Sequence, residues 1–481
     1  MSKAAERMSR VDTAWLRMDT EGNLMTIVGV WLLEPRVAHE AVVERFAGTL
    51  LKYRRFRQKV VEDAVGTSWV DDSQFDIRHH VVRESLPRTR GRSPEQALQS
   101  RVGELCAEPL DRSRPLWQMH LVEALDGPGG TQSALIMRIH HCIADGIALM
   151  AVMNAITDGG KPPPVRAAKP GDGSDWLSEA VLRPLTDLTV KALDMTGRGV
   201  SKSMEALSHP RSLGAHSLDG SVEVARIGFQ VINDVAALAL MPDDSATRLK
   251  GRAQRGKKVA WGRPLPLDEV KAIGRALGGS INDVLLASVA GAIGAYLRDK
   301  GEDVAGKQIR AMVPVNLRPL SQAHELGNRF GLVPLTLPIG LVNPVERVYA
   351  VRARMNELKG SYQPLLAFGV LALSGLFIKP VQDAVINLFA KKATAVMTNV
   401  PGPSVPLKLC GATVKQVMFW VPASGDIGMG VSILSYGGGV QFGLITDAKL
   451  CPDPEQIVQR FAPEFEKLLM TTMMLPWQRA A

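Results

Sequence analysis

One stretch of the sequence decides the fold: Leu135-Ile136-Met137-Arg138-Ile139-His140-His141-Cys142-Ile143-Ala144-Asp145-Gly146. Apolar residues alternate up to His140, which predicts a strand, and a helix-like run begins after Gly146. The two histidines should therefore lie where a strand gives way to a turn, a usual place for reactive side chains. A neutral imidazole can take a proton from an alcohol and return it to a leaving group. Because neighbouring side chains of an extended backbone point to opposite faces, only one ring can enter a given cleft.

Composition and charge narrow the class of protein. The chain has 481 residues, of which 46% are hydrophobic and 22% charged, so it should be globular, with two or three domains. Its net charge of +9 favours polyanionic partners such as nucleic acid, anionic lipid or the phosphates of coenzyme A. Nucleic acid is the least favoured of the three, because aromatic residues make up only 5% and no nucleic-acid motif is present.

The cysteines and the apolar runs indicate where the protein acts. The four cysteines are scattered without a C-x-x-C pair, which argues against zinc, a redox motif or a secreted disulfide framework. We interpret Cys142 as a small packing residue, not a nucleophile. The N-terminus has no apolar core of a signal peptide, and the most apolar run, Pro364–Ile378, is too short for a membrane-spanning helix. We expect a cytoplasmic protein that does not span a bilayer.

Changes in pattern divide the chain into three parts. Residues 1–158 carry strands and helices and end after the helix that follows Gly146. Residues 159–247 begin with a stretch rich in proline, glycine and lysine and continue as a helical pattern with few strand signals, which predicts a helical linker. Residues 248–481 again mix strand and helix patterns, including a hairpin turn at Tyr436-Gly437-Gly438-Gly439, and form the second domain.

The whole set of motifs resembles a particular family. His-His-x-x-x-Asp-Gly is the motif of acyl-CoA-dependent acyltransferases related to chloramphenicol acetyltransferase and to peptide-synthetase condensation domains. Together with five further motifs, it resembles the bacterial wax ester synthase/diacylglycerol acyltransferases (WS/DGAT): Pro115-Leu116-Trp117, Ser280-Ile281-Asn282-Asp283-Val284, Val313-Pro314-Val315-Asn316-Leu317-Arg318-Pro319, Gly327-Asn328-Arg329-Phe330-Gly331 and Thr398-Asn399-Val400-Pro401-Gly402-Pro403. The resemblance covers nearly the whole chain, from about Ser9 to Met470.

The resemblance implies a fold and a set of roles. The fold would be α/β, with two chloramphenicol-acetyltransferase-like domains that have mixed sheets, a helical linker, and a tunnel between the domains for acyl-CoA and the acceptor. His141 would be the general base, and His140 would orient the loop. Asp145 would be a structural carboxylate paired with an arginine, and Gly146 would supply space or a backbone angle that a side chain forbids. The reaction would need no acyl-enzyme, metal or cofactor, since acyl-CoA is a substrate.

Other polar residues are candidates for binding charge. Asn399 or Thr398 would stabilise the oxyanion of the tetrahedral intermediate, with Asn282 and Asp283 as further candidates. Ser280, Asn282 and Asp283 are also ordinary helix N-cap types, so capping is the plain alternative for them. A basic cluster that includes Arg255, Lys257 and Lys258 would receive the phosphates of acyl-CoA, although such a run of charge is more often a solvated face. The list of candidates contains no metal ligand.

The expected activity is O-acyl transfer from acyl-CoA to diacylglycerol, to a long-chain fatty alcohol, or to both. Such substrates lie in membranes and lipid droplets, so we expect peripheral contact with the inner membrane and droplets. The positive charge and the apolar region Pro364–Phe389, followed by Lys391-Lys392, suit this contact, although a buried pair of core helices suits that region equally well.

Three alternatives stay open. The first is an acyltransferase of the same fold with another acceptor, such as an amine or a short alcohol. The second is a non-catalytic lipid-droplet or lipid-binding protein, against which the intact His141, Asp145 and Gly146 argue. The third is a metal site at the histidines, which lacks a third ligand nearby in the sequence. The sequence does not indicate the acyl chain length, the preferred acceptor or the oligomeric state.

Overall fold

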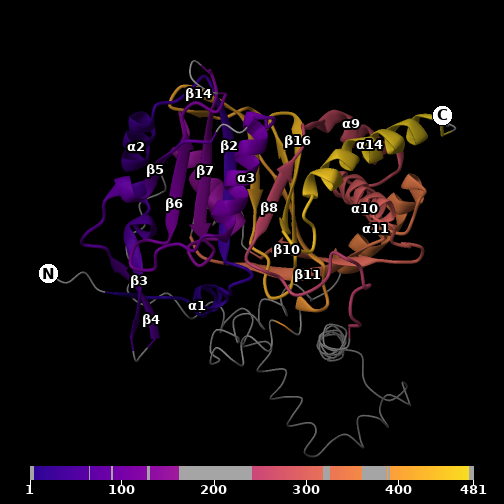
Figure 1. The fold of residues 1–481 in the computed structure, drawn as a ribbon, viewed down its shortest axis with the longest axis horizontal. Helices are drawn as coiled ribbons and strands as arrows, with labels where there is room; N and C mark the ends of the chain where they lie inside the picture. The colour runs from indigo at the N-terminus through magenta and orange to yellow at the C-terminus, as the bar shows by residue number, and fades with distance from the viewer. Residues whose placement is uncertain are drawn as a thin grey trace, which may run out of the picture.

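The computed structural model describes residues 5–63, 66–87, 90–126, 130–161, 241–317, 326–359, 387 and 390–475. Most of the predicted helical linker, at 162–240, lies outside the described residues. The apolar region Pro364–Phe389 lies outside them too, apart from Asn387. The described chain folds into two large mixed sheets with helices on their faces, which confirms the predicted α/β class (Figure 1).

The first sheet carries the histidine motif. Its strands follow the order β13 (Lys408–Leu409), β14 (Ala412–Trp420), β2 (Thr26–Glu34), β7 (Ser133–His140), β6 (Trp117–Val122) and β5 (Val81–Glu84). All neighbours are antiparallel except β5 and β6. Residues of α1 (Arg10–Arg17), α2 (His39–Gly48) and α4 (Gly146–Ile156) share a core with one face of this sheet. The other face packs on α3 (Pro94–Ala107).

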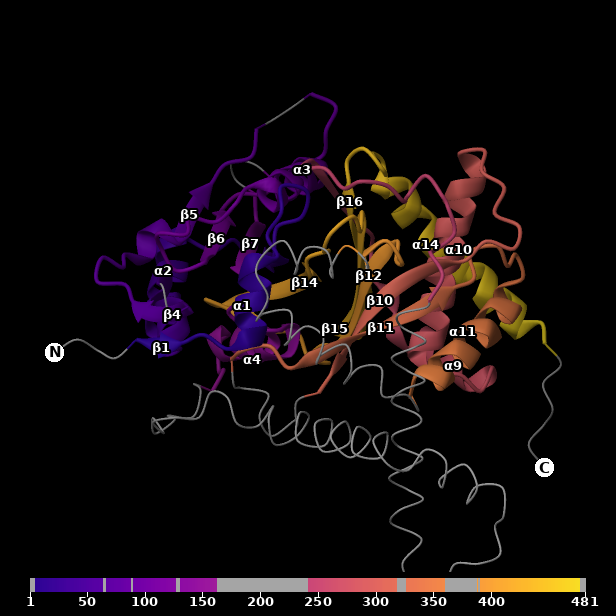
Figure 2. The same cartoon turned by 90° about the horizontal axis from the view of Figure 1, so that it is seen from below.

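The second sheet lies beside α3, and its helices cover the side away from the first domain (Figure 2). Its strands follow the order β11 (Phe330–Leu337), β10 (Ile309–Asn316), β12 (Ala395–Pro401), β15 (Met429–Tyr436), β16 (Gly439–Asp447) and β8 (Lys257–Trp261), and the short β9 (Leu265–Pro266) also pairs with β16. The covering helices are α9 (Leu267–Ala276), α10 (Ile281–Asp299), α11 (Pro344–Lys359) and α14 (Pro454–Met473). The predicted hairpin is present, with Gly437 and Gly438 at positive φ in its turn.

Smaller elements complete the first half. A three-stranded sheet has the order β1 (Glu6–Arg7), β4 (Gly66–Asp71) and β3 (Gln58–Asp63). Three short 3-10 helices lie beside it along the chain: η1 (Leu50–Lys52), η2 (Arg54–Arg57) and η3 (Ile77–His79).

The predicted division at 158 and 248 needs one correction. Strands β13 and β14 come from the second half of the sequence, but β14 pairs with β2 from Val28 to Glu34 and so belongs to the first sheet. In both views β14 lies among the strands of the first half (Figures 1 and 2). Asp158 holds the turn between the two strands, since its carboxylate accepts the backbone amides of Cys410 and Gly411. The second domain therefore supplies an edge of the first.

Helix α10 is the one described helix that is long and apolar enough to cross a membrane by length and composition. Most of its apolar window, 78%, is buried within the protein, which is the ordinary property of a core helix. It packs between the second sheet and α14, so burial in the protein accounts for its apolar composition.

Candidate active site

Backbone hydrogen bonds fix the histidines at the end of β7. The His140 amide donates to the carbonyl of Leu116 at 2.9 Å, and the His141 amide donates to that of Met25 at 2.7 Å. The Ile143 amide then donates to the His140 carbonyl at 3.0 Å and closes a turn. The predicted strand-to-turn transition is therefore present, and the turn leads directly into α4.

His141 lies in an aromatic enclosure. Its ring stacks on Trp15 of α1, with centroids 4.1 Å apart and planes 14° from parallel, and Phe330 at the start of β11 lies 5.4 Å away. Only 2% of the residue is exposed. This burial lowers the pKa of His141 to about 4, because the charged ring loses its hydration, and the residue's own backbone carbonyl and Asn328 oppose the shift only in part. The ring is therefore neutral near pH 7, the form that accepts a proton.

His140 has different neighbours. Its Nδ1 accepts the Cys142 amide at 3.2 Å, so the ring proton lies on Nε2, which faces Asp19 Oδ2 at 3.3 Å. Burial would raise the pKa of Asp19, but hydrogen bonds from His140, the Met25 amide and Arg112 outweigh it and lower the pKa to about 2. His140 thus holds the turn, and the two rings contact separate surroundings, as expected of neighbours on an extended strand.

The motif's turn docks on the second half of the chain. The Asp145 amide donates to the Gly327 carbonyl at 3.2 Å, and Asp145 Oδ2 accepts the Arg329 amide at 3.0 Å. Between them, Asn328 Nδ2 donates to the His141 carbonyl at 2.7 Å. Asp145 Oδ1 accepts the Ala148 amide, so Asp145 is also the N-cap of α4. We expected Asp145 to pair with the guanidinium group of an arginine. In the hydrogen bond with Arg329, the donor is the backbone amide of the arginine.

Two neighbours of the histidines need comment. The backbone angle expected as one role of Gly146 is not needed, because its φ is not positive, and no protein atom lies within 4 Å of where a Cβ would stand. The glycine instead borders open space at the start of α4. Cys142 is buried in the core and burial raises its pKa well above the usual value, which fits the predicted packing role.

The structure separates the oxyanion candidates. Asn399 Nδ2 donates to Asn282 Oδ1 at 2.8 Å, which leaves the amide hydrogens of Asn282 and one of Asn399 for a ligand. Asp283 is excluded, because it is buried and forms the capping box of α10 with Ser280, and a carboxylate has no hydrogen to donate. Thr398 is buried and its hydroxyl donates to the Val431 carbonyl, so it is excluded as well.

The asparagine pair lies at the same end of the second sheet as the aromatic enclosure. Strands β10 and β12 run parallel, and Asn316 at the end of β10 is opposite Phe330. Asn399 lies near the end of β12, about 10 Å from Phe330 across two strand spacings. Asn282 lies in the first turn of the 19-residue α10, where the helix dipole favours negative charge.

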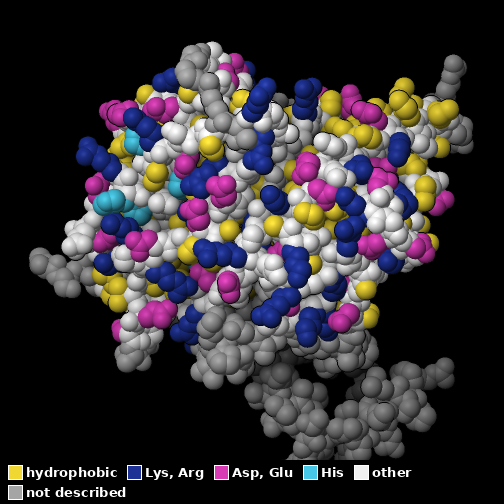
Figure 3. All heavy atoms as spheres, viewed as in Figure 1, with side chains coloured by type: hydrophobic (Ala, Val, Ile, Leu, Met, Phe, Trp, Pro, Cys, Tyr) yellow, Lys and Arg dark blue, Asp and Glu magenta, His cyan; other side chains and the backbone are white. Residues whose placement is uncertain are grey.

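The phosphate candidates differ in exposure. Lys257 is poorly placed: its side chain is only 8% exposed and its ammonium lies 3.7 Å from Asp447, so its charge is already balanced. It lines a small cavity between the domains with Thr26 and Cys106. Arg255 and Lys258 are exposed. Figure 3 shows basic side chains interspersed with acidic ones over this face, and several gather in its lower middle.

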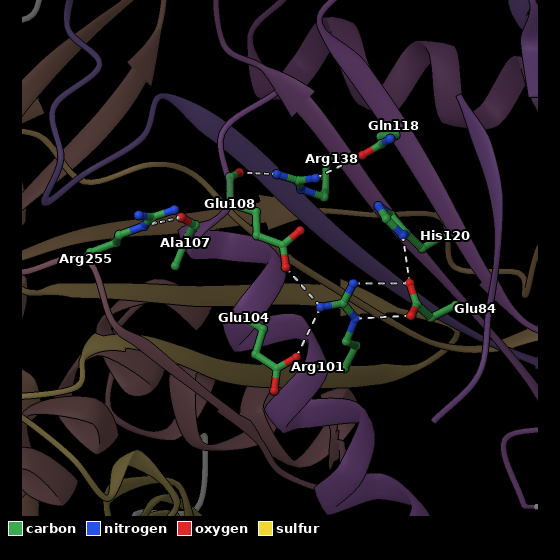
Figure 4. Close-up of polar contacts among 9 residues, drawn as sticks. All are labelled: Glu84, Arg101, Glu104, Ala107, Glu108, Gln118, His120, Arg138 and Arg255. Atoms are coloured by element: carbon green, nitrogen blue, oxygen red, sulfur yellow. Dashed lines mark hydrogen bonds and ion pairs between the residues drawn. The ribbon is translucent and has the colours of Figure 1, made fainter. Parts of the chain in front are cut away.

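Figure 4 shows polar contacts that tie α3 to strands β5, β6 and β7 of the first sheet. Arg138, two residues before His140, donates to Gln118 Oε1 at 3.0 Å and to the carbonyl at the C-cap of α3. His120 Nδ1 bonds Glu84 at 2.9 Å, and Arg101 of α3 bonds the same carboxylate at 3.2 Å. Arg255 donates to the carbonyl of the last residue of α3 at 3.2 Å, so it ties the second domain to this helix.

The sequence did not single out several residues that contact the histidines, which are Trp15, Asp19, Asn328 and Phe330, or the residues that bond two of these in turn, Asp12 and Arg112. Asn328 and Phe330 belong to a motif quoted for the resemblance, but nothing in their local pattern indicates a contact with His141. The apolar face of α1 would have predicted that Trp15 is buried in a core. It would not have predicted the contact with His141.

Two family profiles match the chain, and the boundary between them differs from the predicted division at 158 and 248. The wax ester synthase/diacylglycerol acyltransferase catalytic domain profile matches residues 8–285, and the WS/DGAT C-terminal domain profile matches residues 326–469. The chain is 27% identical over 432 residues to the Mycobacterium tuberculosis protein named "Probable diacyglycerol O-acyltransferase tgs1", covering 88% of this chain and 87% of that one. A second M. tuberculosis relative, tgs2, is 26% identical over 95% of this chain and 97% of its own length.

Solved structures share the fold. The wax ester synthase/diacylglycerol acyltransferase of Marinobacter aquaeolei superposes with a TM-score of 0.65 at 20% identity, over 98% of this chain and all of that one. The first condensation domain of the calcium-dependent antibiotic synthetase gives a TM-score of 0.56 at 13% identity, over 98% and 97% of the two chains. The chain therefore has the expected two-domain α/β fold, which these two proteins share.

Removal of the stacked indole should restore an ordinary pKa to His141. In Trp15→Ala, water reaches the ring, so the pKa should rise toward about 6.5. At about pH 6, NMR of protein labelled at its histidines should show a neutral His141 in the wild type and substantial protonation in the variant. Trp15→Phe, which keeps an aromatic cover, should behave as the wild type. Equal protonation in all three proteins would contradict desolvation by Trp15 as the cause.

Proposed function

Because the chain belongs to the wax ester synthase/diacylglycerol acyltransferase family, we propose that it moves a long-chain acyl group from acyl-CoA to diacylglycerol, a long-chain fatty alcohol, or both. The observation that carries this proposal is the buried, neutral His141 at the seam between the two domains. It is the group best suited to take the proton of an acceptor hydroxyl in a site from which water is excluded.

The reaction would proceed by direct attack. His141 accepts the proton of the acceptor hydroxyl as that oxygen forms a bond to the thioester carbonyl carbon. The tetrahedral intermediate then collapses, the carbon–sulfur bond breaks, and the imidazolium returns the proton to the CoA thiolate. No covalent enzyme intermediate is required, which agrees with a high pKa and full burial for Cys142.

The open space beside Gly146, at the start of α4, leaves room for a substrate group there. The asparagine pair at 282 and 399 supports the binding of the developing oxyanion, and the exposed Arg255 and Lys258 support contact with the CoA phosphates. Among the described residues, no three His, Cys, Asp or Glu side chains form a group that suits a metal ion. The metal alternative therefore gains no support from this part of the chain.

The first test of the function is release of free CoA thiol from palmitoyl-CoA, with hexadecanol or dioleoylglycerol as acceptor. Release should depend on the acceptor and should fall by at least about 100-fold in His141→Ala, because the general base is lost. The better acceptor identifies the main reaction. A folded protein that binds acyl-CoA but releases no thiol with either acceptor would instead have another acceptor or a lipid-binding role.

The asparagine pair gives a second test. Asn399→Ala should lower kcat by roughly 100- to 1,000-fold, since an oxyanion donor is typically worth about 2.7–4 kcal/mol. Thr398→Val is the matched control on the same strand: it loses only the hydroxyl bond to Val431 and should keep its turnover. A normal kcat in Asn399→Ala would remove this residue from the site.

Peripheral contact with a membrane or lipid droplet is part of the proposal. It is supported by the net charge of +9 and by the lipid nature of the acceptors. Of the Lys391-Lys392 pair, Lys391 is exposed while Lys392 is only 5% exposed, so one lysine of the two faces outward. The apolar region that precedes them lies outside the described residues.

Flotation with liposomes that contain anionic lipid tests this contact. The protein should float with the vesicles at low salt and less at high salt, because electrostatic attraction is screened. Equal failure to float at both salt concentrations would exclude surface binding of this kind.

A further inference from the structure

Half of the large hydrophobic side chains that the described residues expose lie within six positions of one another. They surround the last turn of α14: Met470, Met473 and Met474 are 65%, 67% and 85% exposed, and Leu475 is 37% exposed. In Figure 3, hydrophobic side chains gather beside the grey end of the chain, where Figure 1 places the end of α14. Contiguous apolar patches are rare on the surface of soluble proteins, so this one indicates a contact.

The exposure follows from the helix period and not from a loose helix end. Leu468 and Thr472, which lie one turn apart, are both buried, so the inner face of α14 stays packed almost to its last residue. The Met474 amide donates to the Met470 carbonyl at 3.1 Å, which keeps the last turn helical. Met470 and Met474 therefore lie one above the other on the outer face.

The neighbouring helix α11 adds apolar surface to the same layer. Arg347 of α11 donates to Glu464 of α14 at 2.6 Å, and because both residues are buried, this bond fixes the two helices side by side. Val342, which precedes α11, and Tyr349 within it are exposed as well. The helical layer of the second domain thus carries most of the exposed large hydrophobic side chains of the described chain.

The charge near this end of α14 suits a surface of anionic lipid. Glu464 bonds both Arg347 and Lys467, so two cations share one carboxylate. Glu466 is the last acidic residue of the sequence, and the residues after it include Lys467, Trp477 and Arg479. Tryptophan is enriched at the level of lipid headgroups, and basic side chains are attracted to anionic lipids.

We propose that Met470, Met473, Met474 and Leu475 insert into the interface of a lipid surface with anionic headgroups. This inference rests on the proposed function, whose acceptors are held in lipid, and it names the surface that makes the contact. In both ribbon views α14 ends on the side away from the first sheet, so the contact uses no residue of the candidate active site (Figures 1 and 2).

A second copy of the chain is the less favoured occupant of this face. Each partner in a stable protein interface buries roughly 800 Å², and four side chains with these exposures supply less than that. A lipid interface needs no complementary surface, because binding grows with the apolar area that enters it. The flexible, unbranched methionine side chain also adapts to irregular surroundings.

The test is flotation with vesicles of phosphatidylcholine and phosphatidylglycerol at low and at high salt. High salt screens the electrostatic attraction and leaves the apolar part of binding. A triple variant, Met470→Gln with Met473→Gln and Met474→Gln, should show roughly 10-fold less vesicle-bound protein than the wild type at high salt, since the inserted apolar area is lost. Glutamine and methionine have similar helix propensities, so the thermal unfolding midpoint should be unchanged.

Val61→Thr combined with Val405→Thr is the matched control. Both valines are exposed, but Val61 belongs to β3 and Val405 precedes β13, so neither belongs to the helical layer of the second domain. This variant should float as well as the wild type at both salt concentrations. Equal loss of flotation in the control and in the triple variant would show that any exposed apolar side chain suffices, and would contradict the proposal.

Flotation of the triple variant at the wild-type level would also overturn the proposal, as would a wild type that does not float at high salt. If the wild type forms a dimer that the triple variant loses, while flotation is unchanged, the face belongs to a second copy of the chain. Flotation requires no acyl transfer. A wild type that floats through this face but transfers acyl groups to neither lipid acceptor would therefore contradict the proposed function alone.

Discussion

The site depends on the docking of one turn onto a three-residue segment of the other half of the chain. Gly327, Asn328 and Arg329 contact Asp145 and His141 through three hydrogen bonds of 2.7 to 3.2 Å. Two of these bonds use backbone groups of the segment, the Gly327 carbonyl and the Arg329 amide. They therefore depend on the backbone conformation of the segment and not on its side chains. The first domain builds the strand that carries the histidines, but it does not hold the turn by itself. The reactive geometry is therefore a property of the interface between the domains.

The enclosure of His141 has a cost and a benefit. Stacking between Trp15 and Phe330 removes water from the ring, which disfavours its charged form and makes it a weak base in the resting protein. The same dry surroundings strengthen every electrostatic interaction with the charges that develop during a reaction. His140 serves the opposite need, because its bonds to Asp19 and the Cys142 amide occupy both nitrogens and leave it a structural part of the turn.

The sequence predicted those elements that depend on residues close together in the chain. The strand before His140, the helix after Gly146 and the hairpin at Gly437 and Gly438 follow from alternation and turn residues, and the capping alternative for Asp283 proved correct. The side chain of Lys257 is mostly buried beside Asp447, while Lys258 is exposed, as expected of neighbours on a strand, whose side chains point to opposite faces. The contacts of Asn328 were beyond the sequence, because Asp12 lies 316 residues away and a single chain shows no sign of such pairing. The pairing of β14 with β2 joins residues nearly 400 positions apart, so it has the same limit.

The origin of β14 has a consequence for biosynthesis. Strand β2 pairs with β7 on one side and with β14 on the other, and nearly all of its residues are buried. Because β14 begins at Ala412, a ribosome must translate most of the chain after β2 before this edge is covered. At roughly 5–20 residues per second, that delay is on the order of tens of seconds, during which a long apolar strand edge is open to pairing with other chains. The first sheet is thus complete only after most of the second half has been made.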